Sequence, residues 1–143
     1  MSDIKTKEDR SYNMSRISGK NTKPEKLVRK YLFSQGFRYR KNDRKLPGTP
    51  DLVLPKYRTV IFINGCFWHG HEGCKYFVWP KSNVDFWRNK ILTNIARDKL
   101  QTKQLKKMGW TVLVVWECEL RPKTRQATLE TLKNKLLQSL KKN

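Results

Sequence analysis

The chain has 143 residues, of which 37% are hydrophobic, so it is long enough for one folded unit with a modest core. Its 32 Lys and Arg residues against 12 Asp and Glu give a formal net charge of +20, which argues against an enzyme of small metabolites and favours a polyanionic partner. The longest apolar runs, at 59–63 and 111–116, have the length of strands and are too short to span a bilayer, and the first residues contain no apolar signal-peptide core.

An arm and a helix are predicted for the beginning of the chain. Residues 1–21 are polar and basic, with Met14 and Ile17 as the main apolar contact points, so we expect an arm or a short helix there. Thr22 and Glu25 stand at the N-cap and capping-box positions of a helix with one apolar face. The capping position alone is enough to explain Glu25.

A β-hairpin is predicted next. Aromatic and basic residues alternate at 37–40, which predicts a short strand. The turn at 47–50 then delivers Asp51 to the head of a strand at 52–54. A further turn leads back into the apolar run 59–63, so we expect Asp51 opposite the far end of that run.

The rest of the chain predicts a helix at 84–107, a buried strand at 111–116 and a final helix at 128–142. The resulting order is one helix, three strands, a helix, a strand and a helix, which is typical of a mixed α/β sheet flanked by helices. We expect the arm at 1–21 to be followed by a single domain at 22–143.

Cysteine and histidine residues have the spacing of a metal site. Cys66, His71 and Cys74 follow a C-x4-H-x2-C pattern, and Cys118 comes after the last predicted strand. This Cys3His set is standard for structural zinc and leaves no open position for catalysis. An odd number of cysteines argues against a disulfide framework and favours a reducing, intracellular setting. Two alternatives stay open: Cys118 as a small buried residue, and His69 as the ligand in place of His71.

Carboxylates and a histidine are candidates for catalysis. Asp51 at a strand start is a natural Mg²⁺ ligand for phosphodiester cleavage, although an aspartate after Pro50 also caps its own turn. His69 is a candidate general base, and Asp98 on the long helix could orient it. Asp98 could equally be one exposed charge on a basic helix.

Aromatic residues stand where no core periodicity requires them. Phe67 and Trp68 lie in a polar loop, and Trp87 lies near the start of a basic helix. Lys90 and Asn94 follow Trp87 by three and seven residues, so they share its helical face. Rings beside positive charge suit stacking on nucleic-acid bases or wedging between them. The alternative is that these rings only cover the metal loop.

Five short strings of the chain carry a resemblance. They are Asn-Met-Ser-Arg-Ile at 13–17, Asn-Thr-Lys-Pro-Glu at 21–25, Leu-Pro-Gly-Thr-Pro-Asp at 46–51, Gly-Cys-Phe-Trp-His at 65–69 and Trp-Glu-Cys at 116–118. In this order they resemble the very short patch repair (Vsr) endonucleases, from about residue 10 to residue 121. The resemblance implies a restriction-endonuclease-like fold and Mg²⁺-dependent nicking beside the thymine of a T:G mismatch left by deamination of 5-methylcytosine. It also implies a bacterial cytoplasmic, nucleoid-associated monomer, with other mismatch-repair proteins as candidate partners.

The resemblance also implies roles for individual residues. The catalytic set would be Asp51 as Mg²⁺ ligand, His69 as general base, Asp98 as its partner and Glu25 as holder of metal-bound water. The structural Zn²⁺ ligands would be Cys66, His71, Cys74 and Cys118. The DNA-binding set would be the wedge Phe67, Trp68 and Trp87, then Lys90 and Asn94 at the mismatched pair, and Met14 and Ile17 in the opposite groove.

The chain departs from the family pattern at two positions. Ile63 replaces the Thr of the best-known member, which is harmless if the main-chain carbonyl binds the metal. Asn64 replaces a His, so an acid or base role is lost there, while a polar contact to phosphate or metal-bound water survives.

Three functions therefore stay in play. The leading one is a T:G mismatch nicking endonuclease, because the candidate acid, base, orienting carboxylate and aromatic loop occur together. The second is a zinc-stabilised DNA-binding module in which Asp51 and His69 are structural. The third is a restriction endonuclease of the same fold.

Overall fold

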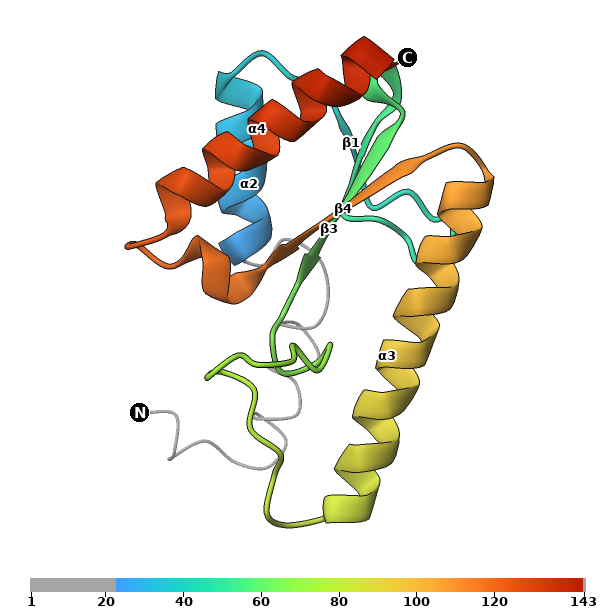
Figure 1. Cartoon of the computed structure of the whole chain (residues 1–143), viewed down its shortest axis with the longest axis vertical. Helices are drawn as coiled ribbons and strands as arrows, with labels where there is room; N and C mark the ends of the chain where they lie inside the picture. Colours follow the sequence, from blue (N-terminus) through green and yellow to red (C-terminus); the bar gives the residue numbers. More distant parts are fainter. Residues whose placement is uncertain (1–22, 143) are drawn as a thin grey trace.

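A computed structural model of the protein describes residues 23–142 (Figure 1). In chain order this part contains α2 (Lys23–Ser34), β1 (Arg40–Lys41), β2 (Leu52–Leu54), the 3-10 turn η2 (Pro55–Tyr57), β3 (Thr59–Asn64), α3 (Val84–Lys107), β4 (Thr111–Trp116), the 3-10 turn η3 (Glu117–Leu120) and α4 (Arg125–Lys142). The elements form a mixed sheet with α2 and α4 on one side and α3 on the other (Figure 1), which confirms the predicted α/β class. Among the described residues, no helix combines the length and apolar character needed to cross a bilayer.

The described strands form one sheet in the order β1-β2-β3-β4. Strands β2 and β3 are antiparallel, with Leu52 opposite Ile61, so the predicted hairpin is confirmed. Strands β3 and β4 are parallel, with Ile61 opposite Leu113. Parallel neighbours need a long connection, and here it consists of the loop 65–83 followed by α3. The loop and the first half of α3 extend beyond the sheet at the same end (Figure 1).

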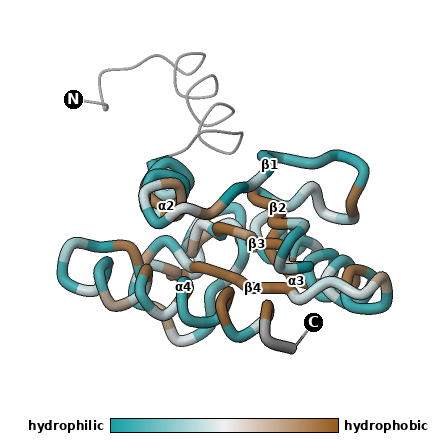
Figure 2. The backbone as a smooth tube through the Cα atoms, turned by 90° about the horizontal axis from the view of Figure 1, so that it is seen from above, coloured by the Kyte–Doolittle hydropathy of each residue, from teal (hydrophilic) through white to brown (hydrophobic). Residues whose placement is uncertain are grey.

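The strands separate two cores. The larger core includes Val28, Leu32, Leu52, Leu54, Ile61, Ile63, Val115, Leu132 and Leu136. The smaller core comprises Val53, Val60 and Leu105, with Phe62, Trp110 and Val112 packed against it. Leu52 and Val53 are neighbours in the chain yet enter different cores, because successive side chains of a strand point to opposite faces. Burial on both faces explains why β2 and β3 are continuous apolar runs, part of the brown band between the helices in Figure 2. The strand predicted as buried at 111–116 is less enclosed: in β4 only Val115 is buried, and Val114 is 41% exposed.

The first strand lies later than predicted. The sequence predicts it at 37–40, whereas β1 is Arg40–Lys41. The cause is the end of α2: Gly36 has φ +89°, and the Phe37 N–H donates to the carbonyl of Leu32 at 3.0 Å. This hydrogen bond closes a glycine cap of the helix, so Phe37 packs into the larger core instead of extending as a strand. The predicted cap at Thr22 lies outside the described residues.

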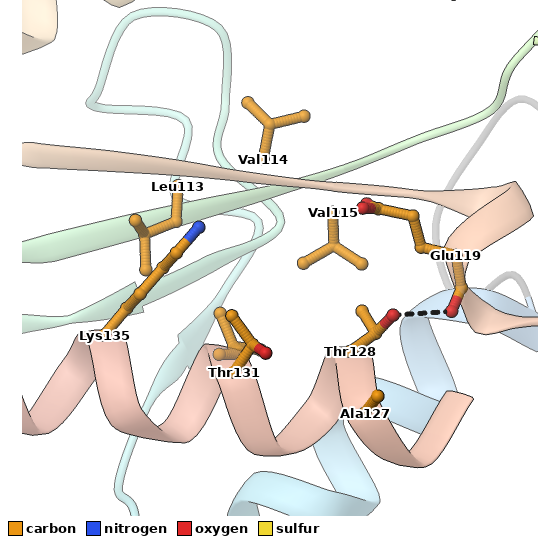
Figure 3. A pocket seen from close by; sticks show the side chains of 9 residues that line it. Leu113, Val114, Val115, Glu119, Ala127, Thr128, Thr131 and Lys135 are labelled. Carbon is orange, nitrogen blue, oxygen red and sulfur yellow. Dashed lines mark hydrogen bonds between the residues drawn. The ribbon is translucent and has the colours of Figure 1, made fainter. Parts of the chain in front are cut away.

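Helix α4 begins at Arg125, three residues before the predicted start at 128. The hydroxyl of Thr128 donates to the carbonyl of Glu119 at 2.8 Å and fixes the helix to η3 (Figure 3). Figure 3 also shows a shallow hollow beside this contact, between β4 and α4, with Lys135 at its other end. The hollow lies on the α4 side of the sheet, away from α3 and from the loop 65–83.

Candidate active site and metal centre

The carboxyl group of Asp51 lies at the open end of the hairpin, opposite the connecting turn and beside the end of β3. The preceding turn holds Thr49 at φ +47°, an uncommon conformation for a β-branched residue. The Ile63 N–H donates a hydrogen bond of 2.7 Å to Asp51 Oδ2. The turn therefore holds the carboxyl against the end of β3, where the hairpin pattern predicted it.

A second carboxyl group shares this position. Glu25 of α2 is only 4% exposed, and its Oε2 lies 3.6 Å from Arg29 Nη1. Burial raises the pKa of Asp51 to about 7, and the hydrogen-bonded Glu25 acts in the same direction, whereas the Ile63 N–H and the charge of His69 lower it. Two neighbouring carboxyl groups repel each other when both are ionised, and a bound divalent cation would stabilise that doubly charged state.

The raised pKa predicts a pH-dependent stability. The carboxyl of Asp51 contributes its full stability below its ordinary pKa of 3.8 and loses it as the pH rises through about 7. In Mg²⁺-free buffer, Asp51→Asn should therefore raise the melting temperature relative to wild type, by an amount that grows between the ordinary pKa of 3.8 and about pH 7 and then levels off. Asp43→Asn, at an exposed aspartate that caps its own turn by accepting the Lys45 N–H, is the control. A melting-temperature difference that does not change with pH would contradict the prediction.

His69 and Asp98 form a close pair across the loop and α3. His69 Nδ1 lies 2.6 Å from Asp98 Oδ2, and both side chains are partly exposed, at 28% and 30%. A carboxylate can only accept, so Nδ1 carries the hydrogen and Nε2 keeps a lone pair in the neutral ring. Asp98 is thus a fixed partner of His69, and His69 is engaged outside the cysteine cluster. This arrangement leaves Nε2 free to accept a proton.

Two contacts set the position of this loop on α3. Gly70 has φ +57°, and a Cβ there would meet Ile95 Cδ1 at 2.6 Å, so only glycine permits the close approach. The buried amide of Asn94 donates to the carbonyl of Trp68 at 2.9 Å and accepts from Arg97 Nη2 at 2.8 Å. In this structure Asn94 therefore holds the main chain next to His69.

The cluster predicted from cysteine spacing is assembled. One ligand atom from each of Cys66, His71, Cys74 and Cys118 lies within 4.8 Å of all the others. The register explains how distant residues meet: Asn64 pairs with Trp116, so the chain positions two residues beyond each carry a cysteine to the same end of the sheet. Tetrahedral zinc with Zn–S bonds of about 2.3 Å needs sulfur atoms roughly 4 Å apart, which this set can supply with little movement. The donor set fits structural zinc.

The cluster has neighbours that orient it. Trp116 stacks on the ring of His71 with centroids 3.9 Å apart and planes 1° apart, and it lies edge-on to His69 at 6.4 Å. The main-chain N–H of Trp116 donates a hydrogen bond of 2.8 Å to Glu119 Oε1. Burial raises the pKa of the Cys66 thiol to about 12, so a metal must displace a firmly held proton.

The predicted wedge residues form one aromatic cluster. The ring of Phe67 lies 5.4 Å from Trp68 and 5.3 Å from Trp87, and Trp68 lies 5.7 Å from Trp87. All three are partly exposed. They pack on each other at the end of α3 instead of entering either core of the sheet.

The other predicted residues are distributed around this centre. Lys90 is exposed on α3. Asn64 is nearly buried and lines a small cavity together with Asp98 and Gln101. Met14 and Ile17 lie outside the described residues.

Sequence reasoning missed two residues that shape the site. Trp116 was recognised only as part of a motif, and its stacking on His71 depends on the parallel register of β3 and β4. Gly70 was not singled out, although a glycine between two histidines in a loop signals a close main-chain approach.

The chain has clear similarities to known proteins. Residues 2–75 match the family described as DNA mismatch endonuclease Vsr. The type II nicking enzyme V.NmeAIP of Neisseria meningitidis is 57% identical over 123 residues, 86% of this chain and 87% of that protein. V.XorIIP of Xanthomonas oryzae, also a type II nicking enzyme, is 50% identical over 120 residues, 84% of this chain and 88% of that protein. The DNA mismatch endonuclease Vsr of Escherichia coli is 45% identical over 121 residues, 85% of this chain and 77% of that protein.

Similarity of this extent, on an α/β fold that carries a buried carboxylate beside a His–Asp pair, defines a DNA endonuclease. The chain belongs to the Vsr family of mismatch and nicking endonucleases. Its substrate is DNA, which accounts for the net charge of +20.

Proposed function

We propose that the protein nicks the thymine strand of a T:G mismatch in double-stranded DNA and so starts repair back to C:G. The observation that carries the proposal is the pairing of His69 in the loop with Asp98 of α3, whose side chains lie 2.6 Å apart. His69 is also close enough to Asp51 for its charge to lower the pKa of that carboxyl group. Two relatives bear the name of nicking enzymes and a third that of a mismatch endonuclease, which supports cleavage of one strand at a mispair.

In the proposed reaction, Asp51 would hold a Mg²⁺ ion, and Glu25 beside it would hold metal-bound water. Such an ion would supply charge stabilisation for the attacking and leaving oxygens. His69 Nε2 takes a proton from the water that attacks phosphorus, and an O–P bond forms. The bond to the leaving deoxyribose oxygen breaks, and that oxygen takes up a proton from solvent. Asp98 accepts from Nδ1 and keeps the imidazole in the required tautomer throughout.

Mismatch recognition is assigned to the aromatic cluster and to α3. Phe67, Trp68 and Trp87 would separate a weakened base step, because a mispair costs less to unstack than a matched pair. Exposed Lys90 would contact the mispair together with Asn94, whose amide also holds the main chain of Trp68. Asn64, which lines a small cavity with Asp98, would contact phosphate or metal-bound water.

The remaining assignments complete the proposal. Residues 1–21 would form a DNA-contacting arm in which Met14 and Ile17 touch the groove opposite the wedge, with 22–143 as the endonuclease domain. We expect a cytoplasmic, nucleoid-associated monomer, because one copy carries both the reading and the cutting residues. Other mismatch-repair proteins are candidate partners.

A strand-specific nicking assay tests the function. Duplexes with T:G in varied sequence contexts, and otherwise identical duplexes with C:G or T:A, are labelled on each strand in turn and incubated with and without Mg²⁺. The expected product is a nick in the thymine strand of the T:G duplex that depends on Mg²⁺. Equal cutting of matched duplexes, or cutting of both strands, would favour a restriction enzyme instead.

A further inference from the structure

Exposed apolar side chains follow the zinc-type cluster along the chain and continue onto the start of α3. Val78 is 67% exposed, Trp79 44% and Phe86 61%. Together with Arg88 we call these residues the flanking patch. Large apolar groups that gather at the surface mark places that a partner covers.

The flanking patch is joined to the aromatic wedge by ring contacts. Phe77 bridges the two, with its ring centroid 6.1 Å from that of Phe67 and 4.9 Å from that of Trp79. On α3, Phe86 lies 5.2 Å from Trp87. The flanking patch and the aromatic wedge therefore form one continuous surface, so a partner that contacts the wedge can also reach the patch.

The charges around the flanking patch indicate which partner that is. The guanidinium of Arg88 lies 6.0 Å from the ring centroid of Trp79. Exposed Lys81 and Lys90 lie on the same segment of chain, against one carboxylate, Asp85, in the first turn of α3. An apolar protein partner gains nothing from this cationic rim, whereas a nucleic acid offers sugars and bases for the rings and phosphates for the cations.

We propose that Trp79 and Arg88 form a second DNA contact, on the duplex that flanks the mispair, with the ring against a sugar or base edge and the guanidinium on a phosphate. This inference rests on the proposed function. It extends the footprint of the protein beyond the base pair that the wedge opens. The energy of this contact depends on how many base pairs lie on that side of the mismatch.

Duplexes of graded length test the second contact. With the T:G pair kept, base pairs are removed one at a time from one end and then from the other, and Kd is measured by fluorescence anisotropy for wild type, Trp79→Ala and Arg88→Ala. Trp79→Ala should weaken binding to the long duplex by about tenfold. The affinity of wild type should fall sharply at one truncation step on one side of the mismatch, where the contacted base pair is removed. The affinity of the two variants should change little at that step, because they already lack the contact. Arg88→Ala should reduce the slope of log Kd against log salt by about 1.

A matched pair elsewhere serves as the control. Phe33 is 61% exposed under the guanidinium of Arg38, 5.5 Å away, in the last turn of α2. This end of α2 lies far from the start of α3 (Figure 1). Phe33→Ala should bind every duplex as wild type does. Variants that bind all duplexes like wild type, or that lose the same factor at every length, would overturn the inference. Arg88→Ala removes no buried side chain, so it still decides the question if Trp79→Ala unfolds.

Matched duplexes of the same lengths, with C:G in place of T:G, separate this inference from the proposed function. If wild-type protein does not prefer T:G over C:G, the proposed function fails, whatever Trp79 does. If wild type prefers T:G but shows no length step that depends on Trp79, only the second contact fails.

Discussion

Replacing Asp51 with Asn should abolish Mg²⁺-dependent nicking of a T:G duplex while leaving DNA affinity nearly unchanged. Asn has the same shape and can still accept the Ile63 N–H, but it removes the negative charge that would hold the metal. We expect a loss on the order of 10³-fold or more in the single-turnover rate, because the charge stabilisation of the transferred phosphate is lost. The rate is measured at saturating protein, and the affinity by anisotropy in Ca²⁺ or without metal.

Two further variants show whether the loss of nicking is specific to the charge of Asp51. Asp43→Asn changes an exposed aspartate that accepts the N–H of Lys45 in its own turn, and it should nick at the wild-type rate. His69→Ala should also be slow, but with the metal site intact. An Asp51→Asn protein that still nicks within about tenfold of wild type would mean that the metal is held elsewhere and that our mechanism is wrong.

Removal of the metal from the Cys3His cluster should release the loop 65–83 and abolish nicking, while the sheet stays folded. The described structure has no helix or strand in this loop, so its order depends on the cluster, on the aromatic contacts and on Asn94. Bound structural zinc contributes on the order of 10 kcal/mol to the folding of small metal-dependent units. Hydrogen exchange should therefore speed up in 65–83 after chelation and stay slow in 59–64, and added Zn²⁺ should restore both protection and activity.

The control for chelation is a variant that lacks one ligand. Cys74→Ser should show fast exchange in the same loop before any chelator is added, and Mg²⁺ should not rescue it. Unchanged exchange in 65–83 after complete metal loss would rule out the structural role. That result would favour the alternative in which Cys118 is a half-buried side chain with no metal-binding role.

Patterns in the sequence were sufficient to predict the three main strands of the sheet and the Cys3His cluster. The continuous apolar runs predicted β2 and β3 because both faces of these strands are buried. The run at 111–116 also predicted β4, although Val114 there is exposed. The cysteine spacing predicted the cluster because all three cysteines take part. The first strand was misplaced because alternation at 37–40 cannot reveal that Gly36 adopts a left-handed conformation and draws Phe37 into the core.

The contact between His69 and Asp98 could not be predicted from spacing alone. His69 and Asp98 are separated by a loop and about four turns of helix, and they meet only because Gly70 and Asn94 set that loop against α3. No local propensity encodes such a contact, so before the family resemblance Asp98 could equally be an exposed charge. Glu25 had an adequate local explanation as a cap, and its contact with Asp51 required the packing of α2 against the hairpin.

The parallel register of β3 and β4 also sets an order of events during folding. Cys66 comes two residues after Asn64 and Cys118 two residues after Trp116, so the thiols meet only when these two strands have paired. A chain emerging from the ribosome cannot complete the ligand set until almost the whole fold has been synthesised. Metal uptake would then be a late step in folding: only a molecule whose strands have already paired could order the loop that carries His69.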